Sequence, residues 1–296
     1  MKFHLLVLFF IAPILISTQV QASFLFTPAS LDRNHAKVLV VLHGCLQTPE
    51  SMTLGTGWNA IAEKNNMVVL YPRVPEGTHK LGCWSWYLPE NQTAEAGQLK
   101  NIVEEIKSTI RMLKLSQPEL YLSGISSGAA MVAGLIACYP QMFSAVAVHS
   151  GPSYGLAQNL EDAEKVLKYG PTPEAATLGP CDPKKFTGSL LVIQGSADKV
   201  VHPKNADRWI QDFIGADGKS VRVLDSRSKV TDYRSSDGRL GRVIMIQGLG
   251  HAWSGAKENL TYNLPTLVPF FSDRGPSATN LSWEFFQEIR KNQVTN

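Results

Sequence analysis

Residues Glu119–Cys138 read ELYLSGISSGAAMVAGLIAC, and this stretch decides the fold class. Its first part, ELYLS, predicts a buried strand, and its last part, from Ala129 onward, predicts a helix of small apolar residues packed tightly under a sheet. Between them, Gly124-Ile125-Ser126-Ser127-Gly128 fits the pattern G-x-S-x-G. A strand, a sharp glycine-flanked turn and a helix are the setting in which this pattern presents a nucleophilic serine. The alternative is a tight turn that is simply rich in glycine and serine.

Other short apolar runs lie on both sides of this stretch along the chain. Such runs are typical of strands that are buried on both faces of a mostly parallel sheet. The runs are Lys37–Leu42, Met67–Tyr71, Ala145–His149, Ser189–Gln194 and Arg242–Gln247. Helical patterns alternate with them at Thr93–Leu115, Asn205–Phe213 and Trp283–Arg290. This alternation predicts an α/β fold with a mostly parallel central sheet flanked by helices.

Two connections between these elements are long. Tyr154–Gly188 is rich in glycine and proline, and it is either a cap over a site or a plain surface excursion. Asp225–Arg242 contains Asp237-Gly238 between runs of valine, tyrosine and isoleucine, which predicts a hairpin at a sheet edge. The chain shows no internal repeat and no linker, so we expect residues 23–296 to form one domain.

The composition limits the class of protein. The 296 residues are 44% hydrophobic and 18% charged, which is ordinary for a globular protein and excludes a disordered or collagen-like chain. The net charge is only +3, and the basic residues are scattered. We therefore expect no nucleic-acid partner.

The N-terminus has the pattern of a signal peptide. Lys2 precedes an apolar run from Leu5 to Ile16, and Val20-Gln21-Ala22 gives a small-x-small ending. The alternative is a membrane anchor, but the run is shorter than the roughly 18 apolar residues of a spanning helix. We expect residues 1–22 to be removed, leaving a secreted, extracellular or periplasmic protein with no stable membrane anchor.

Four cysteines lie in the expected mature chain: Cys45, Cys83, Cys138 and Cys181. An even number in an exported protein favours disulfides over free thiols, and four cysteines allow three pairings. Of these we favour Cys45 with Cys83 and Cys138 with Cys181. The cysteines form no CxxC pair and have no histidine cluster near them, so we expect no metal site.

A serine nucleophile needs a base to take its proton, and the base needs an acid to orient it. In this kind of sheet the three residues follow in the order Ser, Asp or Glu, His. Asp198 follows the run SLLVIQG, and His251 follows the run RVIMIQG, so both lie at carboxyl ends of predicted strands. His202 is also late in the chain, but it is only four residues from Asp198 and is interpreted as a loop residue.

These residues predict a catalytic triad in which Ser126 attacks a carbonyl, His251 carries the proton and Asp198 orients the imidazole. The alternatives are a turn or capping residue for Asp198 and a buried structural role for His251. The oxyanion formed in such a reaction needs backbone donors. We expect these to be the amides of Ser127, directly after the nucleophile, and of Cys45, in the loop after an early strand.

Aromatic residues gather at two places near the predicted site. Trp84 and Trp86 lie in the segment GCWSWY, where we interpret them as core residues. Trp253 follows His251 by two positions, which suggests a wall of the acyl pocket and a contact with substrate.

Seven segments together resemble the esterase family of polyhydroxybutyrate (PHB) depolymerases and the related feruloyl and acetylxylan esterases. They are LHGCLQ (42–47), CWSWY (83–87), GISSGAAM (124–131), AVAVHSG (145–151), QGSADKVV (194–201), GLGHAWSG (248–255) and GPSATNLSWEFF (275–286). The resemblance implies an α/β-hydrolase fold and secreted ester hydrolysis without a cofactor. It also implies the triad Ser126, Asp198 and His251, the oxyanion donors Cys45 and Ser127, and a substrate contact at Trp253.

The resemblance leaves the substrate open. Secreted depolymerases of solid polyester often carry a linker and a C-terminal polymer-binding domain, and we expect no separate polymer-binding domain here. This favours soluble hydroxyalkanoate oligomers over crystalline polymer. Feruloyl or acetyl esters of carbohydrates are the next alternative. A serine peptidase and a non-catalytic binding protein on an esterase scaffold are the remaining ones.

Overall fold

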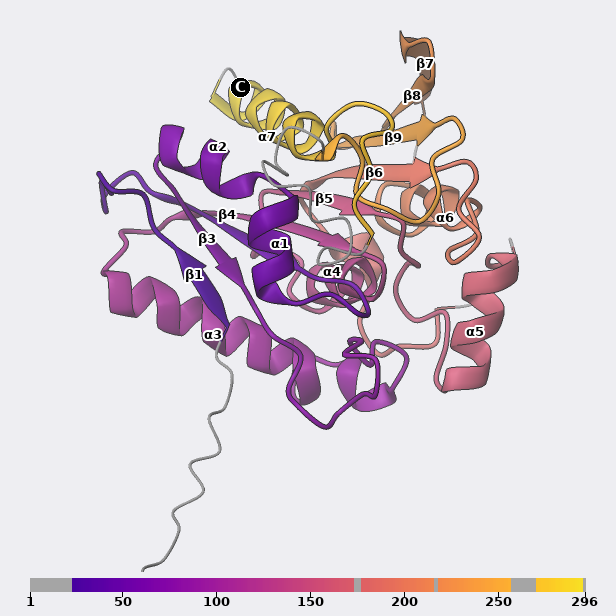
Figure 1. Cartoon of the computed structure of the whole chain (residues 1–296), viewed down its shortest axis with the longest axis horizontal. Helices are drawn as coiled ribbons and strands as arrows, with labels where there is room; N and C mark the ends of the chain where they lie inside the picture. The colour runs from indigo at the N-terminus through magenta and orange to yellow at the C-terminus, as the bar shows by residue number, and fades with distance from the viewer. Residues whose placement is uncertain (1–22, 173–176, 216–217, 257–269, 295–296) are drawn as a thin grey trace, which may run out of the picture.

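A nine-stranded, mostly parallel sheet runs through the protein (Figure 1). The computed structural model describes residues 23–172, 177–215, 218–256 and 270–294. The strand order is β1-β3-β2-β4-β5-β6-β9-β8-β7, and the six strands from β3 to β9 in this order are parallel. The three others pair antiparallel at the two edges. The predicted α/β fold is thereby confirmed.

All six strands expected from apolar runs are present. The strands are β1 (Phe24–Phe26), β2 (Lys37–Leu42), β3 (Met67–Tyr71), β4 (Glu119–Ile125), β5 (Ala145–His149), β6 (Ser189–Gly195), β7 (Gly218–Asp225), β8 (Ser228–Arg234) and β9 (Leu240–Ile246). Along β2 the side chains alternate between the two faces of the sheet. Val38, Val40 and Leu42 pack into one apolar cluster, whereas Leu39 and Val41 pack into another. The parallel strands are therefore buried on both faces, which is why they read as continuous apolar runs.

Helices cover both faces of this sheet. They are α1 (Pro49–Gly55), α2 (Trp58–Lys64), α3 (Gly97–Leu113), α4 (Ser127–Cys138), α5 (Leu160–Tyr169), α6 (Asn205–Phe213) and α7 (Ala278–Val294). Side chains of α3, α4 and α6 belong to one apolar cluster, and those of α1, α2 and α7 belong to the other. The sheet therefore lies between two helical layers, and the carboxyl ends of its parallel strands share one edge.

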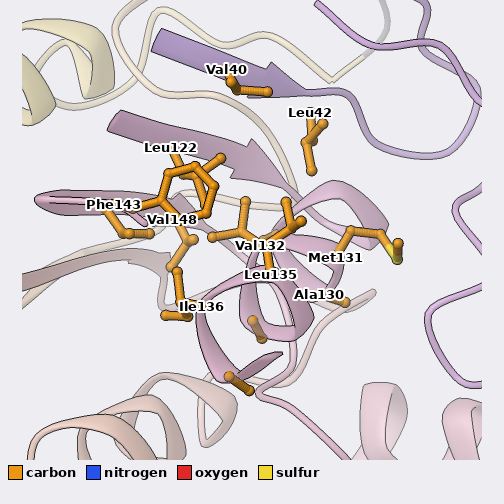
Figure 2. Packing of buried hydrophobic residues seen from close by; sticks show 14 of the residues in the cluster. Val40, Leu42, Leu122, Ala130, Met131, Val132, Leu135, Ile136, Phe143 and Val148 are labelled. Carbon is orange, nitrogen blue, oxygen red and sulfur yellow. The ribbon is translucent and has the colours of Figure 1, made fainter. Parts of the chain in front are cut away.

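Helix α4 lies at the centre of the first layer (Figure 2). Its residues from Ser127 to Ala137 are all buried, and Val132 and Leu135 pack beside Leu122 of β4. Small residues in α4 allow the helix to lie close to the strands. A Cβ on Gly128 would lie 2.3 Å from the carbonyl oxygen of Leu42, so only glycine fits beside β2. This contact fixes the start of α4 against the strands.

The predicted edge hairpin is present as β8 and β9, with Asp237-Gly238 in the turn between them. Gly238 adopts a left-handed φ of 88°, which explains glycine at this position. Strand β7 continues the sheet beyond β8 and projects from the body of the molecule (Figure 1). Every residue of β7 is exposed, so it carries no burial pattern from which its place could be predicted.

The expected signal peptide, residues 1–22, lies outside the described residues. Within the described ranges, no helix is both long and apolar enough to cross a membrane.

Candidate active site

The serine of the G-x-S-x-G pattern occupies a sharp turn between β4 and α4. Ser126 has φ 58° and ψ −124°, a conformation that side-chain-bearing residues rarely adopt. Its N–H donates a 3.0 Å hydrogen bond to the carbonyl oxygen of His149, at the end of the neighbouring strand β5. Such strain costs about 1–3 kcal/mol and persists only where the surroundings hold it. Here β5 and the buried helix α4 hold it.

The predicted acid and the predicted base come from the loops after two neighbouring strands. Asp198 follows β6, and His251 follows β9, which pairs with β6 in parallel register. The distance from Nδ1 of His251 to Oδ2 of Asp198 is 2.8 Å. The amides of Val200 and Val201 donate to the other carboxylate oxygen, at 2.9 and 2.8 Å. The carboxylate is thereby fixed behind the imidazole.

The charge of Asp198 is stabilised in place. Burial by itself would raise the pKa of this carboxyl, but the hydrogen bond and charge of His251 and the amides of Val201 and Val200 lower the pKa below its usual value. An ionised carboxylate accepts a hydrogen bond from a protonated Nδ1 of the imidazole. This leaves Nε2 of His251 as the nitrogen that can take a proton from a nucleophile.

Ser126 and His251 line the same cavity, whose volume is about 320 Å³. In the described part of the chain, their side chains do not form a hydrogen bond with each other. Bonds of this kind are often loose in a free enzyme and tighten when substrate binds. The structure thus brings the predicted nucleophile, base and acid to one place.

Two backbone amides at this cavity are available to an oxyanion. Ser127 is the first residue of α4, so its N–H has no acceptor within the helix. In the loop after β2, the amide of Gly44 donates to Gln47 (2.8 Å) and that of Leu46 donates to Leu81 (2.8 Å). The amide of Cys45 between them has no acceptor among the described residues. Both Cys45 and Ser127 line the cavity.

The rest of the cavity wall is largely apolar. The aromatic segment after β3 and helix α5 supply most of it: Leu81, Trp84, Trp86, Tyr87, Leu160, Ala163, Glu164 and Leu167. Trp84 and Trp86 are buried, as predicted for core residues, and they also form part of this wall. Helix α5 lies within the long connection 154–188. Of the two interpretations of that connection, the cap over a site is the one its position favours.

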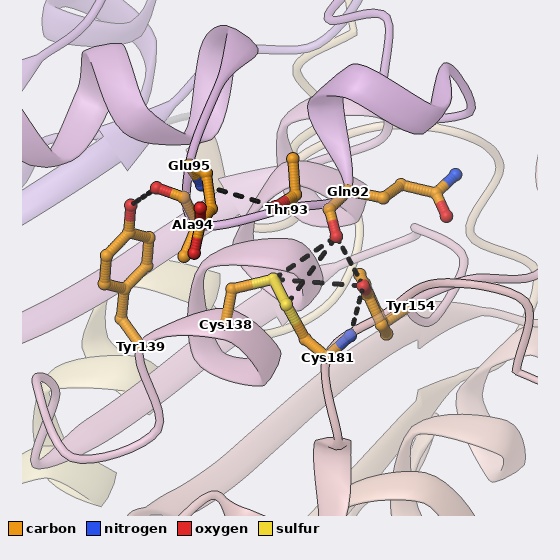
Figure 3. Close-up of a disulfide and its surroundings, with 8 residues drawn as sticks. All are labelled: Gln92, Thr93, Ala94, Glu95, Cys138, Tyr139, Tyr154 and Cys181. Atoms are coloured by element: carbon orange, nitrogen blue, oxygen red, sulfur yellow. Dashed lines mark hydrogen bonds between the residues drawn. A yellow bond between two sulfur atoms is a disulfide. The ribbon is translucent and has the colours of Figure 1, made fainter.

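Two disulfides hold these walls, and they are the two that the sequence favoured. Cys45–Cys83 joins the loop with the candidate oxyanion amide to the aromatic segment. Cys138–Cys181 joins the end of α4 to the connection that carries α5 (Figure 3). Beside it, the hydroxyl of Tyr154 donates to the carbonyl oxygen of Gln92 (2.6 Å) and accepts from the amide of Cys181 (3.1 Å).

Trp253 lies away from the cavity wall. Its side chain is 1% exposed, its indole N–H donates to Thr279, and its ring packs against His149 with centroids 5.8 Å apart. The chain turns into the core directly after His251, where Trp253 exchanges backbone hydrogen bonds with residues 270 and 272. This position suits a support for the loop of His251 and does not suit the expected contact with substrate.

One residue near the triad was not identified from sequence. His149, at the end of β5, is fully buried, and its Nδ1 lies 2.9 Å from the hydroxyl of Ser150. Burial, and secondarily the nearby His251, lower the pKa of His149 to about 3. It is therefore neutral at physiological pH. No sequence pattern indicates this residue, because His149 is the last residue of an apolar run that predicts a buried strand. Only the structure places it beside the turn of Ser126.

No group of three His, Cys, Asp or Glu side chains that could hold a metal ion occurs in the described part of the chain. The residues at this cavity have the chemistry needed for acyl transfer. The described residues provide a hydroxyl group, a histidine oriented by a carboxylate and two backbone amides without an acceptor among them, all around one largely apolar cavity.

Known proteins resemble this chain in sequence and in structure. Residues 20–230 match the family model described as "Esterase PHB depolymerase". The chain is 31% identical over 245 residues to feruloyl esterase B of Thermothelomyces thermophilus, covering 77% of this chain and 82% of that protein. It is 25% identical to poly(3-hydroxyalkanoate) depolymerase C of Paucimonas lemoignei, covering 77% of this chain but only 57% of the depolymerase.

The fold is also found among solved structures. The acetyl xylan esterase from Aspergillus awamori superposes with a TM-score of 0.63 at 22% identity, covering 77% of this chain and 88% of that one. At this identity the likeness concerns the fold, which is that of the α/β hydrolases. The family match spans more than half of the chain and includes the predicted nucleophile and acid. The chain therefore belongs to the esterase PHB depolymerase family of carboxylic ester hydrolases.

Proposed function

We propose that this protein is a secreted serine esterase that cleaves hydroxyalkanoate esters through an acyl-enzyme intermediate. One observation carries the proposal: Ser126, His251 and the amides of Cys45 and Ser127 line the same largely apolar cavity, and Asp198 is hydrogen-bonded to His251. Neither amide has an acceptor among the described residues.

The proposed reaction has two halves. In the first, Oγ of Ser126 attacks the ester carbonyl carbon while Nε2 of His251 takes the hydroxyl proton. The tetrahedral oxyanion accepts hydrogen bonds from the two amides. The carbon–oxygen bond to the alcohol then breaks, and the alcohol leaves with the proton from His251. In the second half, water repeats the attack on the acyl-enzyme and releases the acid and the free serine.

The lining of the cavity favours an uncharged, largely apolar substrate. The described residues of its walls are mostly leucines and aromatic rings; they include one carboxylate, Glu164, and no lysine or arginine. A short hydroxyalkanoate acyl group has little polarity apart from its ester and hydroxyl oxygens, so it buries well against such walls. The sequence similarity to a poly(3-hydroxyalkanoate) depolymerase supports the same substrate class.

A second candidate is the ester of an aromatic acid with a carbohydrate. Trp84, Trp86 and Tyr87 lie together on one side of the cavity, and flat rings of this kind stack on aromatic acyl groups. The 31% identity to feruloyl esterase B supports this candidate. Acetyl esters of xylan are the smaller carbohydrate alternative.

Secretion is proposed on two grounds. Residues 1–22 have the pattern of a signal peptide, and two disulfides suit an oxidising compartment outside the cytoplasm.

Acid release from a soluble 3-hydroxybutyrate oligomer and from methyl ferulate separates the candidates. We expect the oligomer to be cleaved and Ser126→Ala to lose at least about 10⁴-fold of the rate. Cleavage of methyl ferulate alone would assign the protein to aromatic esters. If the purified protein cleaves neither substrate nor p-nitrophenyl butyrate, it is a binding protein on an esterase scaffold and the proposal is wrong.

A further inference from the structure

One wall of the active-site cavity carries a negative charge. Glu164, on the α5 wall, is the only carboxylate among the described residues that line the cavity, and these residues include no lysine or arginine. Leu160, Leu167 and the ring of Tyr87 also line this cavity. A carboxylate in this wall contributes negative potential to the cavity.

No ion pair neutralises this charge in the described part of the chain. Lys165 forms ion pairs with Glu161 at 2.7 Å and Asp162 at 3.7 Å. Lys168 is one turn after Glu164 on the same helix, and its ammonium group lies 5.1 Å from the centre of the Tyr169 ring. Glu164 is on the exposed side of α5, so solvent screens its charge partly but not completely.

The charge of Glu164 also acts on the aromatic segment of the cavity wall. Burial raises the pKa of the Tyr87 hydroxyl, and the carboxylate of Glu164 raises it further. Tyr87 belongs to the aromatic segment and Glu164 belongs to α5, and both line the cavity, so the carboxylate acts on a second part of the wall as well as on its own.

We propose that Glu164 is a specificity-determining residue that makes the esterase discriminate against substrates bearing a free carboxylate. The proposal rests on the proposed esterase function and deepens it. A hydroxyalkanoate oligomer has a carboxylate at one end only. Repulsion by Glu164 disfavours binding that places this end in the cavity, and it favours cleavage at uncharged internal or blocked esters.

The test compares matched substrates that differ in one charge. The first pair is the 3-hydroxybutyrate dimer as free acid and as primary amide, which changes the charge on the alcohol side of the ester. The second pair is p-nitrophenyl glutarate and p-nitrophenyl glutaramate, which changes it on the acyl side. The control variant is Glu161→Gln, on the same helix, whose carboxylate pairs with Lys165 and does not line the cavity.

We expect the wild type to prefer the amide over the acid, measured as the ratio of kcat/KM, in at least one pair. In that pair Glu164→Gln should reduce the ratio about fivefold by raising kcat/KM for the acid, as expected for two like charges several ångströms apart in a partly hydrated site. Salt at 0.5 M should reduce the wild-type ratio as well. Glu161→Gln should leave it unchanged.

The proposal is overturned if Glu164→Gln leaves the ratio unchanged in both pairs, or if Glu161→Gln changes it as much. Failure of the esterase assignment looks different. In that case the wild type cleaves none of the four substrates, whereas failure of the charge-selection proposal leaves all of them cleaved with unaltered ratios.

Discussion

Asp198 and His251 are 53 positions apart in the chain, yet their side chains lie 2.8 Å apart, Oδ2 to Nδ1. Each residue follows a strand, and the two strands, β6 and β9, are parallel neighbours. The carboxyl ends of neighbouring parallel strands meet at one edge of the sheet, so the pairing follows from the topology.

Asp198→Asn tests the role of this pair. The amide fits the same space, but it cannot stabilise the imidazolium of His251 and it favours the wrong tautomer. We expect kcat to fall about 10⁴-fold with a melting temperature within a few degrees of the wild type. Steady-state kinetics and thermal unfolding check this. A kcat within tenfold of the wild type would remove Asp198 from the mechanism.

Ser127 offers a test of the oxyanion site that separates backbone from side chain. Ser127→Ala keeps the N–H, so we expect kcat within about threefold of the wild type. Ser127→Pro removes the N–H at the first position of a helix, where proline is tolerated. We expect this variant to lose about 10²–10³-fold in kcat.

Circular dichroism and a melting curve verify that Ser127→Pro is folded. Equal activities of the two folded variants would show that the amide of Ser127 does not bind the oxyanion.

The two disulfides should have equal effects on stability and different effects on catalysis. They close loops of similar length, with sequence separations of 38 and 43, so removing either by a double Cys→Ala change should cost about 4 kcal/mol. Only Cys45–Cys83 holds a candidate oxyanion amide. We expect its loss to lower kcat at least about tenfold below that of the Cys138/Cys181 double variant.

Both double variants are assayed at 15 °C after circular dichroism has verified that each is folded, and urea unfolding gives their stabilities. Identical kcat values in the two would contradict a catalytic role for the Cys45 loop.

His149 should make the protein sensitive to acid. Its pKa is about 3 in the folded protein, well below the usual value of about 6.5, so the unfolded chain takes up the proton first. The stability is fully present above about pH 6.5 and falls as the pH drops toward 3, by up to about 1.4 kcal/mol per pH unit from this residue.

Urea unfolding at pH 7, 6, 5 and 4 measures this dependence. His149→Gln, which cannot be protonated, is expected to have a flatter slope of unfolding free energy against pH, whatever its stability at pH 7. A slope equal to that of the wild type would show that His149 does not contribute.

Features that depend on burial and on chain order could be predicted from the sequence. The parallel strands could be predicted because burial on both faces leaves apolar runs such as Lys37–Leu42. The grouping of Ser126, Asp198 and His251 at one place could be predicted because few histidines follow Ser126, and only His251 also follows a buried strand at a distance from Asp198.

Features that depend on tertiary placement were not predictable. Strand β7 is exposed throughout, so its residues carry no alternation that marks a strand. Trp253 is only two positions after His251 in sequence, but a turn into the core separates their environments. Glu164 lies in a connection without a strong pattern, and only the position of α5 across the cavity makes its charge relevant.

The most direct test of the account is covalent labelling of Ser126. A fluorophosphonate reacts with a serine only when a base activates it and an oxyanion site binds the product. We predict that intact-mass and peptide mass spectrometry will show one phosphonyl group per chain, on Ser126, and none on Ser126→Ala. An unlabelled wild type, or a label on another residue with Ser126 unmodified, would contradict the assignment of Ser126 as the nucleophile.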